Sequence, residues 1–400
     1  MSAQTRLGRV MTKRGDGIVI VSGIGPGPSG TGRVLAELAR DSKRLGVRLV
    51  VGPSRSKPLR TALGKRRVRD LLPAIADRLG GWLSPHVAYA SGVLRRADAL
   101  VVIHPQTLGY DLVRRIVDSR AFTWFYVMDA SFFCVRSYNH LADATGPCLK
   151  CLSGQLAAAT ENGCLETVVD GAAAARFIGH LRSAVSRGAA GFLAQNDLHV
   201  RLLRDSFGPE VPIRLVGLWA SDWDRAVDST FQSPAFDRSA PIVFHGSGHP
   251  AKGSGWAFQV AGNCPELSFL FPFARPRSIL TPPNCMFRPM TWETGLEAAV
   301  QAAPLVLVPS LWSAPVEGAL IKSMAVGRAV AVVDNPSAFS HELPAAAVTS
   351  LPTDPPTAAA KIEDLLASGI DSEANARRRW LEDFARSNRP MLENISRCLR

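Results

Sequence analysis

The chain has 400 residues, of which 46% are hydrophobic, with 33 Gly and 28 Pro and a formal net charge of +12. This length and balance exclude a single small module, a disordered chain and a fibrous chain, and they are typical of two ordinary globular domains. No apolar run approaches the roughly 18 residues of a membrane-spanning helix, and the apolar stretch near the start is too short for a signal peptide. We therefore expect a soluble, cytoplasmic protein whose seven cysteines are thiols or metal ligands rather than disulfides.

Predicted strands and helices alternate through the first half of the chain. A β-branched run closed by glycine begins the series, and a helix at 31–46 follows it with apolar residues spaced by three and four. The strands predicted for this half are 17–23, 47–52, 97–105, 121–129 and 189–195. Alternation of this kind predicts a parallel sheet with helices on both faces.

The excess positive charge lies in this first half. Residues 1–200 hold 27 Lys and Arg against 14 Asp and Glu, whereas residues 201–400 hold 19 against 20. The densest basic residues, interleaved with leucines, are Arg55, Lys57, Arg60, Lys65, Arg66, Arg67 and Arg69. Such a segment is typical of contact with an anionic membrane surface or another polyanion, and it is equally typical of a solvated helix face.

The alternation loosens in a polar stretch at 225–240 and then restarts. The second half is predicted to hold strands at 241–246, 267–273, 304–310 and 328–334 and helices near 254–262, 292–302 and 317–326. The predicted division is an N-terminal Rossmann-like domain at 1–218 with a Cys-rich insertion at 134–164, a linker at 219–240, a second domain at 241–375 and a C-terminal helix at 376–400 that crosses back. Two such doubly wound α/β domains, facing each other, place a ligand in the cleft between the carboxyl ends of their strands.

A glycine-rich loop, GIGPGPSGTGR at 23–33, lies between the first strand and its helix. Free backbone N–H groups and the helix dipole at such a junction favour an anion such as phosphate. Gly25, Gly27 and Gly30 match the G-x-G-x-x-G pattern of dinucleotide sites. Those sites need an acid at the end of the second strand, where this chain has a Gly-Pro pair, so a nicotinamide cofactor is disfavoured. A purely structural turn is the alternative.

Two segments of the second half carry candidate binding residues. In FHGSGHPAKG at 244–253, Lys252 follows a glycine-rich strand end, where an ammonium group can neutralise a diphosphate; a solvent-facing loop lysine is the alternative. In VPSLWSAPVEGALIKSMAVGRAVAVVD, Pro315 and Gly318 mark a loop that leads into a helix. Glu317, near the start of that helix, can accept hydrogen bonds from the hydroxyls of a sugar or ribose.

The second of these segments resembles the C-terminal-domain signature of family 4 glycosyltransferases of the GT-B fold, in which a proline-serine strand end precedes an acidic loop, an alanine-methionine-alanine helix and a glycine turn. FHGSGHPAKG is similar to the family's glycine-to-lysine-glycine segment, and the glycine loop, ADALVVIHP and YVMDASFFC stand where the family has counterparts. The resemblance covers most of the chain and is most specific in the C-terminal domain. It implies transfer of a sugar from a nucleotide-sugar donor, with retention and with no cofactor required for catalysis.

The resemblance also implies a set of donor-binding positions. Lys252 would contact the donor diphosphate, Gly27 and Gly30 would approach it from the other domain, and 315–322 would hold the donor sugar and ribose. The expected donor-binding residues are Gly27, Gly30, Ser247, Lys252, Pro315, Glu317, Gly318 and Lys322.

The chain departs from the family pattern within these segments. The arginine that usually follows the first glycine of the lysine motif is Ser247 here. The paired glutamates of the family's E-x7-E pattern correspond to Ala314 and Lys322, which leaves Glu317 as the nearby carboxylate. Glu317 or Lys322 would then have taken over the donor contacts.

A third departure concerns the expected catalytic residues. The family's histidine-aspartate pair after an N-terminal strand reads Met128-Asp129 here. We expect Asp129, or else His104, to assist the acceptor hydroxyl as a base. The alternatives are a helix-capping Asp129 and a strand-end His104 that is satisfied by its neighbours.

Four cysteines fall within 31 residues in the spacing C-x13-C-x2-C-x12-C, namely Cys134, Cys148, Cys151 and Cys164. One C-x2-C with an outlying cysteine on each side can form a tetrahedral thiolate site, so a structural zinc is one hypothesis. Some members of the family carry a similar cysteine-rich insertion at this place. Buried cysteines without a ligand are the other hypothesis.

Three functions are compatible with the sequence. The first is a glycosyltransferase that adds a hexose or related sugar to a glycan or lipid-linked acceptor in surface polysaccharide biosynthesis, with its basic domain on the anionic inner face of the membrane. The second is a catalytically degenerate relative that binds sugar or nucleotide. The third, a zinc-stabilised nucleic-acid-binding protein, is disfavoured because only 7% of the residues are aromatic and no nucleic-acid module is recognisable, so nucleic acid is not an expected partner.

Overall fold

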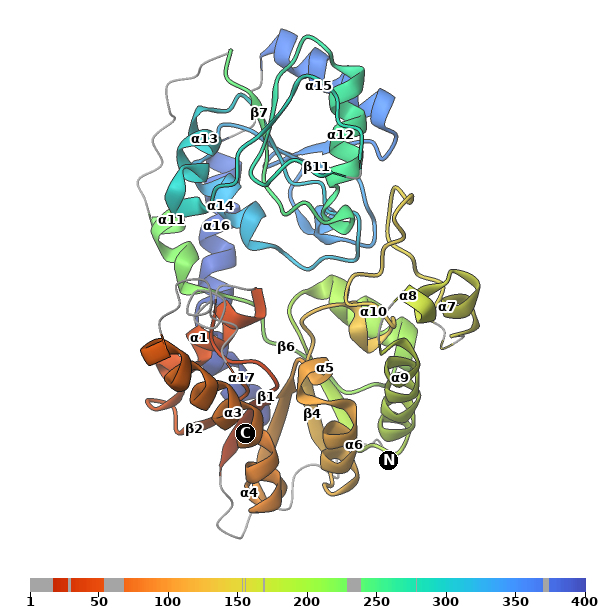
Figure 1. Ribbon diagram of the computed structural model, residues 1–400, viewed down its shortest axis with the longest axis vertical. Coiled ribbons are helices and arrows are strands. Elements are labelled where there is room, and N and C mark those ends of the chain that lie inside the picture. Colours follow the sequence, from red (N-terminus) through yellow and green to blue (C-terminus); the bar gives the residue numbers. More distant parts are fainter. Residues whose placement is uncertain are drawn as a thin grey trace.

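The computed structural model describes residues 17–27, 30–53, 68–152, 154, 156–167, 170–228, 239–277, 279–369 and 374–400. Two α/β domains lie one above the other, each built on a sheet of six parallel strands (Figure 1). The predicted fold class of two doubly wound domains is therefore confirmed. The basic residues at 55–67 and the part of the predicted linker at 229–238 lie outside the described residues.

The first sheet has the strand order β2-β1-β3-β4-β5-β6, and every pairing is parallel. Its strands are β1 (Ile18–Ser22), β2 (Val47–Val51), β3 (Ala99–Ile103), β4 (Thr123–Tyr126), β5 (Ala190–Ala194) and β6 (Ile213–Leu215). β1 and β5 are buried at every position, as continuous apolar runs are when helices cover both faces of a sheet. The chain reverses direction across the sheet between β1 and β3, and a doubly wound sheet opens a crevice at such a reversal point.

The helices of the first domain follow the predicted alternation. They are α1 (Gly30–Ser42), α3 (Val68–Ala90), α4 (Val93–Arg96), α5 (Pro105–Leu108), α6 (Tyr110–Asp118), α7 (Ala157–Glu161), α8 (Cys164–Thr167), α9 (Gly171–Ser186) and α10 (Asp197–Phe207), with the 3-10 helix η2 (Ala130–Phe132). α6 shows why they pack as they do, because its buried residues recur at helical spacing: Leu112, Val113, Ile116 and Val117. α7 and α8 belong to the long insertion between β4 and β5.

The second sheet has the order β12-β11-β10-β7-β8-β9, again parallel throughout. Its strands are β7 (Ile242–Phe244), β8 (Phe269–Phe271), β9 (Cys285–Phe287), β10 (Val306–Leu307), β11 (Val330–Val333) and β12 (Thr349–Leu351). The remaining helices up to the C-terminal pair are η3 (Ser221–Trp223), α11 (Asp224–Asp228), η4 (Pro250–Lys252), α12 (Ser254–Asn263), η5 (Trp292–Thr294), α13 (Leu296–Ala302), α14 (Gly318–Val326), η6 (Phe339–Glu342) and α15 (Pro355–Ser368). The reversal point of this sheet lies between β7 and β10.

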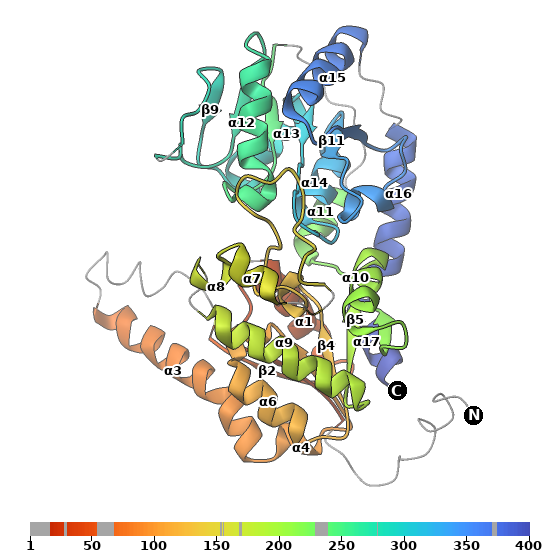
Figure 2. The same ribbon diagram turned by 90° about the vertical axis from the view of Figure 1, so that its right-hand side faces the viewer.

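The C-terminal part of the chain crosses from the second domain back to the first. α16 (Ala374–Asn388) packs beside α14 (Figures 1 and 2), and α17 (Met391–Leu399) packs beside α1 (Figure 1). The sequence predicted one helix at 376–400, and the structure corrects this to two, because Pro390 has no N–H with which to continue the helix. Oδ1 of Asn388 accepts a hydrogen bond from the Leu218 amide at 2.8 Å, so the crossing also holds the residue that precedes the linker.

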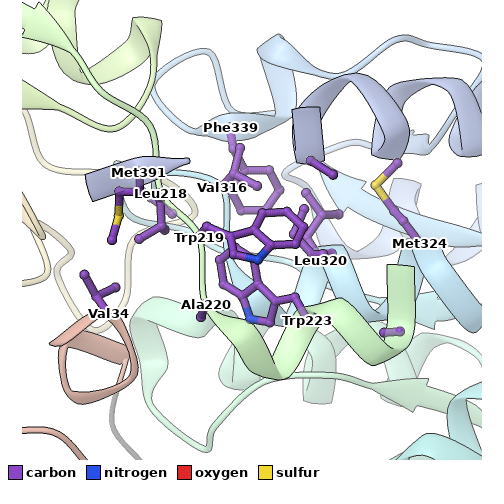
Figure 3. Packing of buried hydrophobic residues seen from close by; sticks show 14 of the residues in the cluster. Val34, Leu218, Trp219, Ala220, Trp223, Val316, Leu320, Met324, Phe339 and Met391 are labelled. Carbon is purple, nitrogen blue, oxygen red and sulfur yellow. The ribbon is translucent and has the colours of Figure 1, made fainter. Parts of the chain in front are cut away.

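Two tryptophans of the linker are buried between the domains. Trp219 is 1% exposed and meets Trp223 edge-on, with 5.5 Å between ring centres. Figure 3 shows both indoles packed beside Val316 and Leu320 of the second domain. One hydrophobic cluster therefore runs from the first sheet through the linker into the second domain and fixes the two domains relative to each other.

The strands agree with the predicted ones except at the edges of the sheets. Every strand predicted from the sequence is present, usually shortened by one or two residues at each end. β6, β9 and β12 were not predicted. Among the described residues, no helix combines the length and the apolar character that crossing a bilayer requires.

Candidate functional site

A cavity of about 450 Å³ lies between the domains. Its walls come from the loops that follow β1, β3, β4 and β5, from the linker, and from the loops that follow β7 and β10. The β1 and β3 loops flank the reversal point of the first sheet, and the β7 and β10 loops flank that of the second. Both crevices that the topology creates therefore open into one cavity.

Lys252 and Glu317 form an ion pair on the wall supplied by the second domain. Nζ of Lys252 lies 2.6 Å from Oε1 of Glu317, and the two side chains are 17% and 12% exposed. The same carboxylate oxygen accepts hydrogen bonds from Ser310 Oγ at 2.9 Å and from Trp312 Nε1 at 3.2 Å. Glu317 therefore has two neutral partners in addition to the lysine.

Two aromatic rings enclose the ammonium group of Lys252. Nζ lies 4.9 Å from the ring centre of Trp312 and 5.3 Å from that of Tyr138, within the range of cation–π attraction. Tyr138 belongs to the insertion of the first domain, and its ring meets Trp312 edge-on at 4.7 Å. The insertion thus reaches across the gap and covers the lysine.

Asn139 joins the two domains next to this lysine. Its Nδ2 donates to Ser313 Oγ at 2.9 Å, and its Oδ1 accepts from the Ser313 amide at 3.0 Å. Asn139 is 1% exposed and Ser313 is fully buried. Because water does not reach these groups, removing the Asn139 side chain would leave the buried amide and hydroxyl of Ser313 without hydrogen-bond partners.

We predict that Asn139→Ala lowers the free energy of unfolding by about 2 kcal/mol, since the Ser313 amide and hydroxyl lose their partners in a buried position. Denaturant titration followed by fluorescence measures the change. Asn263→Ala is the control, because Asn263 lies exposed at the end of α12 and donates to the Gln259 carbonyl of its own helix. Equal midpoints for Asn139→Ala and the wild type would contradict this role of Asn139.

The glycine loop after β1 folds back onto the start of α1. The Gly27 amide donates to Gly32 O at 3.1 Å, and a Cβ on Gly32 would lie 2.7 Å from Gly27 O, so position 32 requires glycine. Gly30 begins the 13-residue helix α1 and lines the cavity, with nothing within 4 Å of a Cβ added there. The N-terminus of α1 therefore lies on the cavity wall, and a helix N-terminus favours an anion.

Asp129 and His104 both line the cavity. Oδ1 of Asp129 accepts hydrogen bonds from the Ser131 amide at 3.0 Å and from Ser131 Oγ at 2.5 Å, so this side chain caps η2. His104 has a φ of +54°, and it is the only non-glycine residue with positive φ in the described part of the chain. A residue held in this conformation costs about 1–3 kcal/mol, and such strain concentrates at functional sites.

A second group of charges adjoins the cavity. Oδ2 of Asp222 lies 2.6 Å from Nζ of Lys322 and 3.1 Å from Nη1 of Arg33. His245 is stacked on Trp292 nearby, with 5.4 Å between ring centres. Burial, together with the charges of Lys322 and Arg33, lowers the pKa of His245 to about 3, so this imidazole is neutral at physiological pH.

The expected donor-binding residues divide into two groups. Those on the cavity wall are Gly30, Lys252, Pro315, Glu317 and Gly318, and those away from it are Gly27, Ser247 and Lys322. The Gly27 amide is used within the glycine loop, and Ser247 is exposed on the loop after β7. Lys322 is 4% exposed and held by Asp222.

The structure adds wall residues that sequence reasoning missed, among them Arg33, Tyr138, Trp223 and Trp312. Nε1 of Trp223 is buried and has no hydrogen-bond partner among the described residues. A Cβ on Gly318 would lie 2.8 Å from that nitrogen, so a glycine is needed beside the indole. Trp312 stands inside the PSLW stretch of the segment already singled out, whereas nothing in the sequence around Trp223 signals its place on the wall.

The four clustered cysteines lie in the insertion and form no disulfide. Within the described ranges, no three or more His, Cys, Asp or Glu side chains are arranged to hold a metal ion. Cys134, Cys151 and Cys164 are buried in hydrophobic clusters, and burial raises the pKa of the Cys134 thiol to about 12. The thiols of Cys148, Cys151 and Cys164 lie close enough to Cys134 to raise its pKa further, so a structural zinc at this cluster stays a prediction. Metal analysis of the purified protein and of a Cys148→Ser/Cys151→Ser variant tests that prediction.

Comparisons with known proteins find relatives in structure only. No family model and no curated protein sequence matches the chain. HepE of Anabaena, solved in complex with UDP, superposes with a TM-score of 0.56 at 13% identity, over 96% of this chain and 99% of that chain. Sucrose-phosphate synthase of Thermosynechococcus elongatus gives 0.56 at 12% identity, over 96% and 98%. WaaG, a glycosyltransferase involved in lipopolysaccharide biosynthesis, gives 0.52 at 12% identity, over 96% and 99%. The chain thus has the GT-B fold of these structures.

Proposed function

We propose that this protein is a glycosyltransferase that moves a sugar from a nucleoside-diphosphate sugar to a hydroxyl group of an acceptor. The observation that carries the proposal is that Lys252 and the N-terminus of α1 lie on walls of one cavity supplied by different domains, each at the reversal point of its own sheet. An ammonium group and a helix N-terminus are both suited to a diphosphate.

In this proposal the donor lies mainly against the second domain. Lys252 neutralises the charge that develops on the departing diphosphate, which is where a fixed positive charge lowers the barrier most. Glu317 and Gly318 form the adjoining wall, where the carboxylate can accept hydrogen bonds from hydroxyls of the sugar or ribose. Trp223 supplies an N–H donor from the linker. Retention of configuration, a hexose as the donor sugar and independence from a metal are further parts of the proposal.

The acceptor lies against the first domain. Asp129 is the proposed base that takes the proton of the acceptor hydroxyl, and His104 is the alternative base. Both line the cavity wall opposite the second domain. Their role is to orient the hydroxyl and hold its proton, while the donor is polarised from the other side.

We propose a glycan or lipid-linked acceptor in surface polysaccharide biosynthesis, met at the inner face of the membrane. WaaG, which shares the fold, acts in lipopolysaccharide biosynthesis. The net positive charge of the first 200 residues is also suited to an anionic lipid surface.

This part predicts salt-sensitive binding to vesicles that contain anionic lipid. Replacing Lys65, Arg66 and Arg67 with glutamine should weaken binding by roughly 100-fold at low salt, because each basic residue near such a surface contributes about 1 kcal/mol. Co-sedimentation at low and high salt measures the fraction of protein bound to the vesicles, and vesicles of phosphatidylcholine alone are the control. Absent or salt-insensitive binding would contradict the membrane location and leave the transferase proposal standing.

A nucleotide-sugar-binding protein without turnover is the second candidate. One observation favours it: Lys322, which stands at the position of a family glutamate, is bound to Asp222 and lies away from the cavity wall. Release of nucleoside diphosphate from a bound donor separates the two candidates, because only the enzyme turns the donor over.

The proposal predicts that at least one nucleotide-sugar raises the melting temperature. A ligand at 100 times its dissociation constant that binds only the folded chain adds about 2.7 kcal/mol to stability. Thermal-shift measurements with UDP-, GDP-, ADP- and dTDP-sugars, and with the matching nucleosides as controls, identify the donor. No shift with any member of the panel, together with no donor turnover, would contradict the proposed function.

A further inference from the structure

One carboxylate next to the cavity is shared by two cations that differ in exposure. Oδ2 of Asp222, in the linker, lies 2.6 Å from Nζ of Lys322 and 3.1 Å from Nη1 of Arg33. The Lys322 side chain is 4% exposed and lies over the ring of Trp292 at 5.2 Å. The Arg33 side chain is 41% exposed and lines the cavity. Lys322 is therefore the fixed partner of Asp222, and Arg33 is the partner that can turn toward a ligand.

The cavity wall carries no excess positive charge before a ligand enters. Among the described residues, its Lys and Arg side chains are Arg33 and Lys252, each paired with a carboxylate, Asp222 and Glu317 respectively, and Asp129 adds a further carboxylate to the wall. A diphosphate brings about two or more negative charges into this space, so its binding requires cations that can leave their present partners.

In both pairs the carboxylate keeps another hydrogen-bond donor when the cavity-wall cation leaves it. If Lys252 turns to a phosphate, Glu317 keeps the hydrogen bonds from Ser310 and Trp312. If Arg33 turns to a phosphate, Asp222 keeps the ammonium group of Lys322. An uncompensated buried carboxylate would oppose the movement, and each carboxylate here retains another donor.

We infer that Arg33 is a second ligand of the donor diphosphate, supplied by α1 of the first domain and acting across the cavity from Lys252. The inference rests on the proposed function and adds to it a residue that the first domain contributes to donor binding. A guanidinium group suits this role because its planar fork can donate two parallel hydrogen bonds to phosphate oxygens. A diphosphate held by both cations would join the two domains through the ligand.

The test compares ligands with and without a diphosphate. Calorimetry measures the dissociation constants of inorganic pyrophosphate and of UDP, GDP, ADP and dTDP, each beside its nucleoside, for the wild type and Arg33→Gln. We expect Arg33→Gln to weaken binding of pyrophosphate and of the preferred nucleoside diphosphate by tenfold or more and to leave nucleoside binding within twofold. Arg33→Lys should recover part of the loss, because it keeps the charge and loses the fork.

The controls separate this role from a structural one. Arg48→Gln removes an exposed arginine on β2 that is not on the cavity wall, so it should bind every ligand as the wild type does. A structural role for Arg33 alone would lower the melting temperature and leave the ratio of diphosphate to nucleoside affinity unchanged. That result overturns the inference and leaves the proposed function standing. The inference is likewise overturned if Arg33→Gln binds diphosphate as tightly as the wild type while Lys252→Ala no longer binds it. If the wild type binds no diphosphate, both are overturned.

Discussion

Replacing Lys252 with alanine should lower sugar-transfer turnover by roughly 100- to 1,000-fold, the usual effect of removing one fixed group that stabilises developing negative charge. The lysine is the cation that the second domain supplies to the cavity wall, and it lies in a cage formed by Tyr138 and Trp312. Its loss also leaves the Glu317 carboxylate, which is 12% exposed, next to the incoming diphosphate. Repulsion by that carboxylate should weaken nucleoside-diphosphate binding by about a further tenfold.

Two additional variants make the result interpretable. A Lys252→Met/Glu317→Gln double variant removes both charges, so it should recover the part of the binding loss that is due to the bare carboxylate. Lys361→Ala is the matched control, because Lys361 is an exposed lysine on α15 that is not on the cavity wall and donates to the Ser350 carbonyl. Steady-state turnover and calorimetric affinity are the measurements. If Lys252→Ala binds the donor as tightly as the wild type does, Lys252 is not a ligand of the donor diphosphate.

Replacing Asp129 with asparagine should lower the turnover number by roughly 100-fold or more while nucleoside-diphosphate affinity stays within about twofold, as expected for a base that acts on the acceptor alone. Asparagine retains a side-chain oxygen that can accept the hydrogen bond from the Ser131 amide, so the cap on η2 is kept. The variant therefore tests the proton-accepting role apart from the capping role.

The controls for Asp129 are an aspartate of the nearby insertion and the histidine on the same cavity wall. Asp143→Asn changes an exposed aspartate of the insertion and should leave turnover unchanged. Asp129→Ala should lower the melting temperature, because it removes the cap, whereas Asp129→Asn should not. If Asp129→Asn keeps full turnover and His104→Gln loses it, the base is His104. If both variants keep full turnover, neither residue is the base, which contradicts the proposed role of this wall.

The central strands could be predicted because burial on both faces leaves a clear trace in the sequence. β1 and β5 are short apolar runs bounded by polar or glycine-rich segments, and the sequence placed both correctly. β6 could not be found in this way, since Ile213–Leu215 is a three-residue edge strand with one arginine and two exposed positions. Short edge strands are defined by their pairing partners, which local sequence does not show.

The parts of the site that are formed by residues adjacent in sequence could be predicted. The glycine loop and the start of α1 are adjacent in sequence, so a strand-to-helix junction with free N–H groups was recognisable. The sequence also singled out Lys252 and Glu317, but it did not indicate that they are bonded to each other, because 65 residues separate them. Their pairing depends on how β7 and β10 come together at the reversal point of the second sheet.

The contacts between domains lay beyond sequence reasoning. The cysteine spacing drew attention to the segment that contains Tyr138, but nothing in it indicated that Tyr138 would contact Lys252 of the other domain. Arg33 follows the glycine loop in sequence, but its ion pair with Asp222 could not be predicted, because it depends on where the linker lies. Such contacts depend on the relative positions of two domains, which the hydrophobic cluster around Trp219 fixes and which no local pattern encodes.

Amide hydrogen exchange, with and without the nucleoside diphosphate that binds most tightly, tests most directly whether the two domains bind one ligand between them. The account predicts slower exchange on both sides of the cavity at once, at the start of α1 in the first domain and at η4 and residues 312–319 in the second. Protection confined to one domain, or to a surface away from these segments, would contradict it.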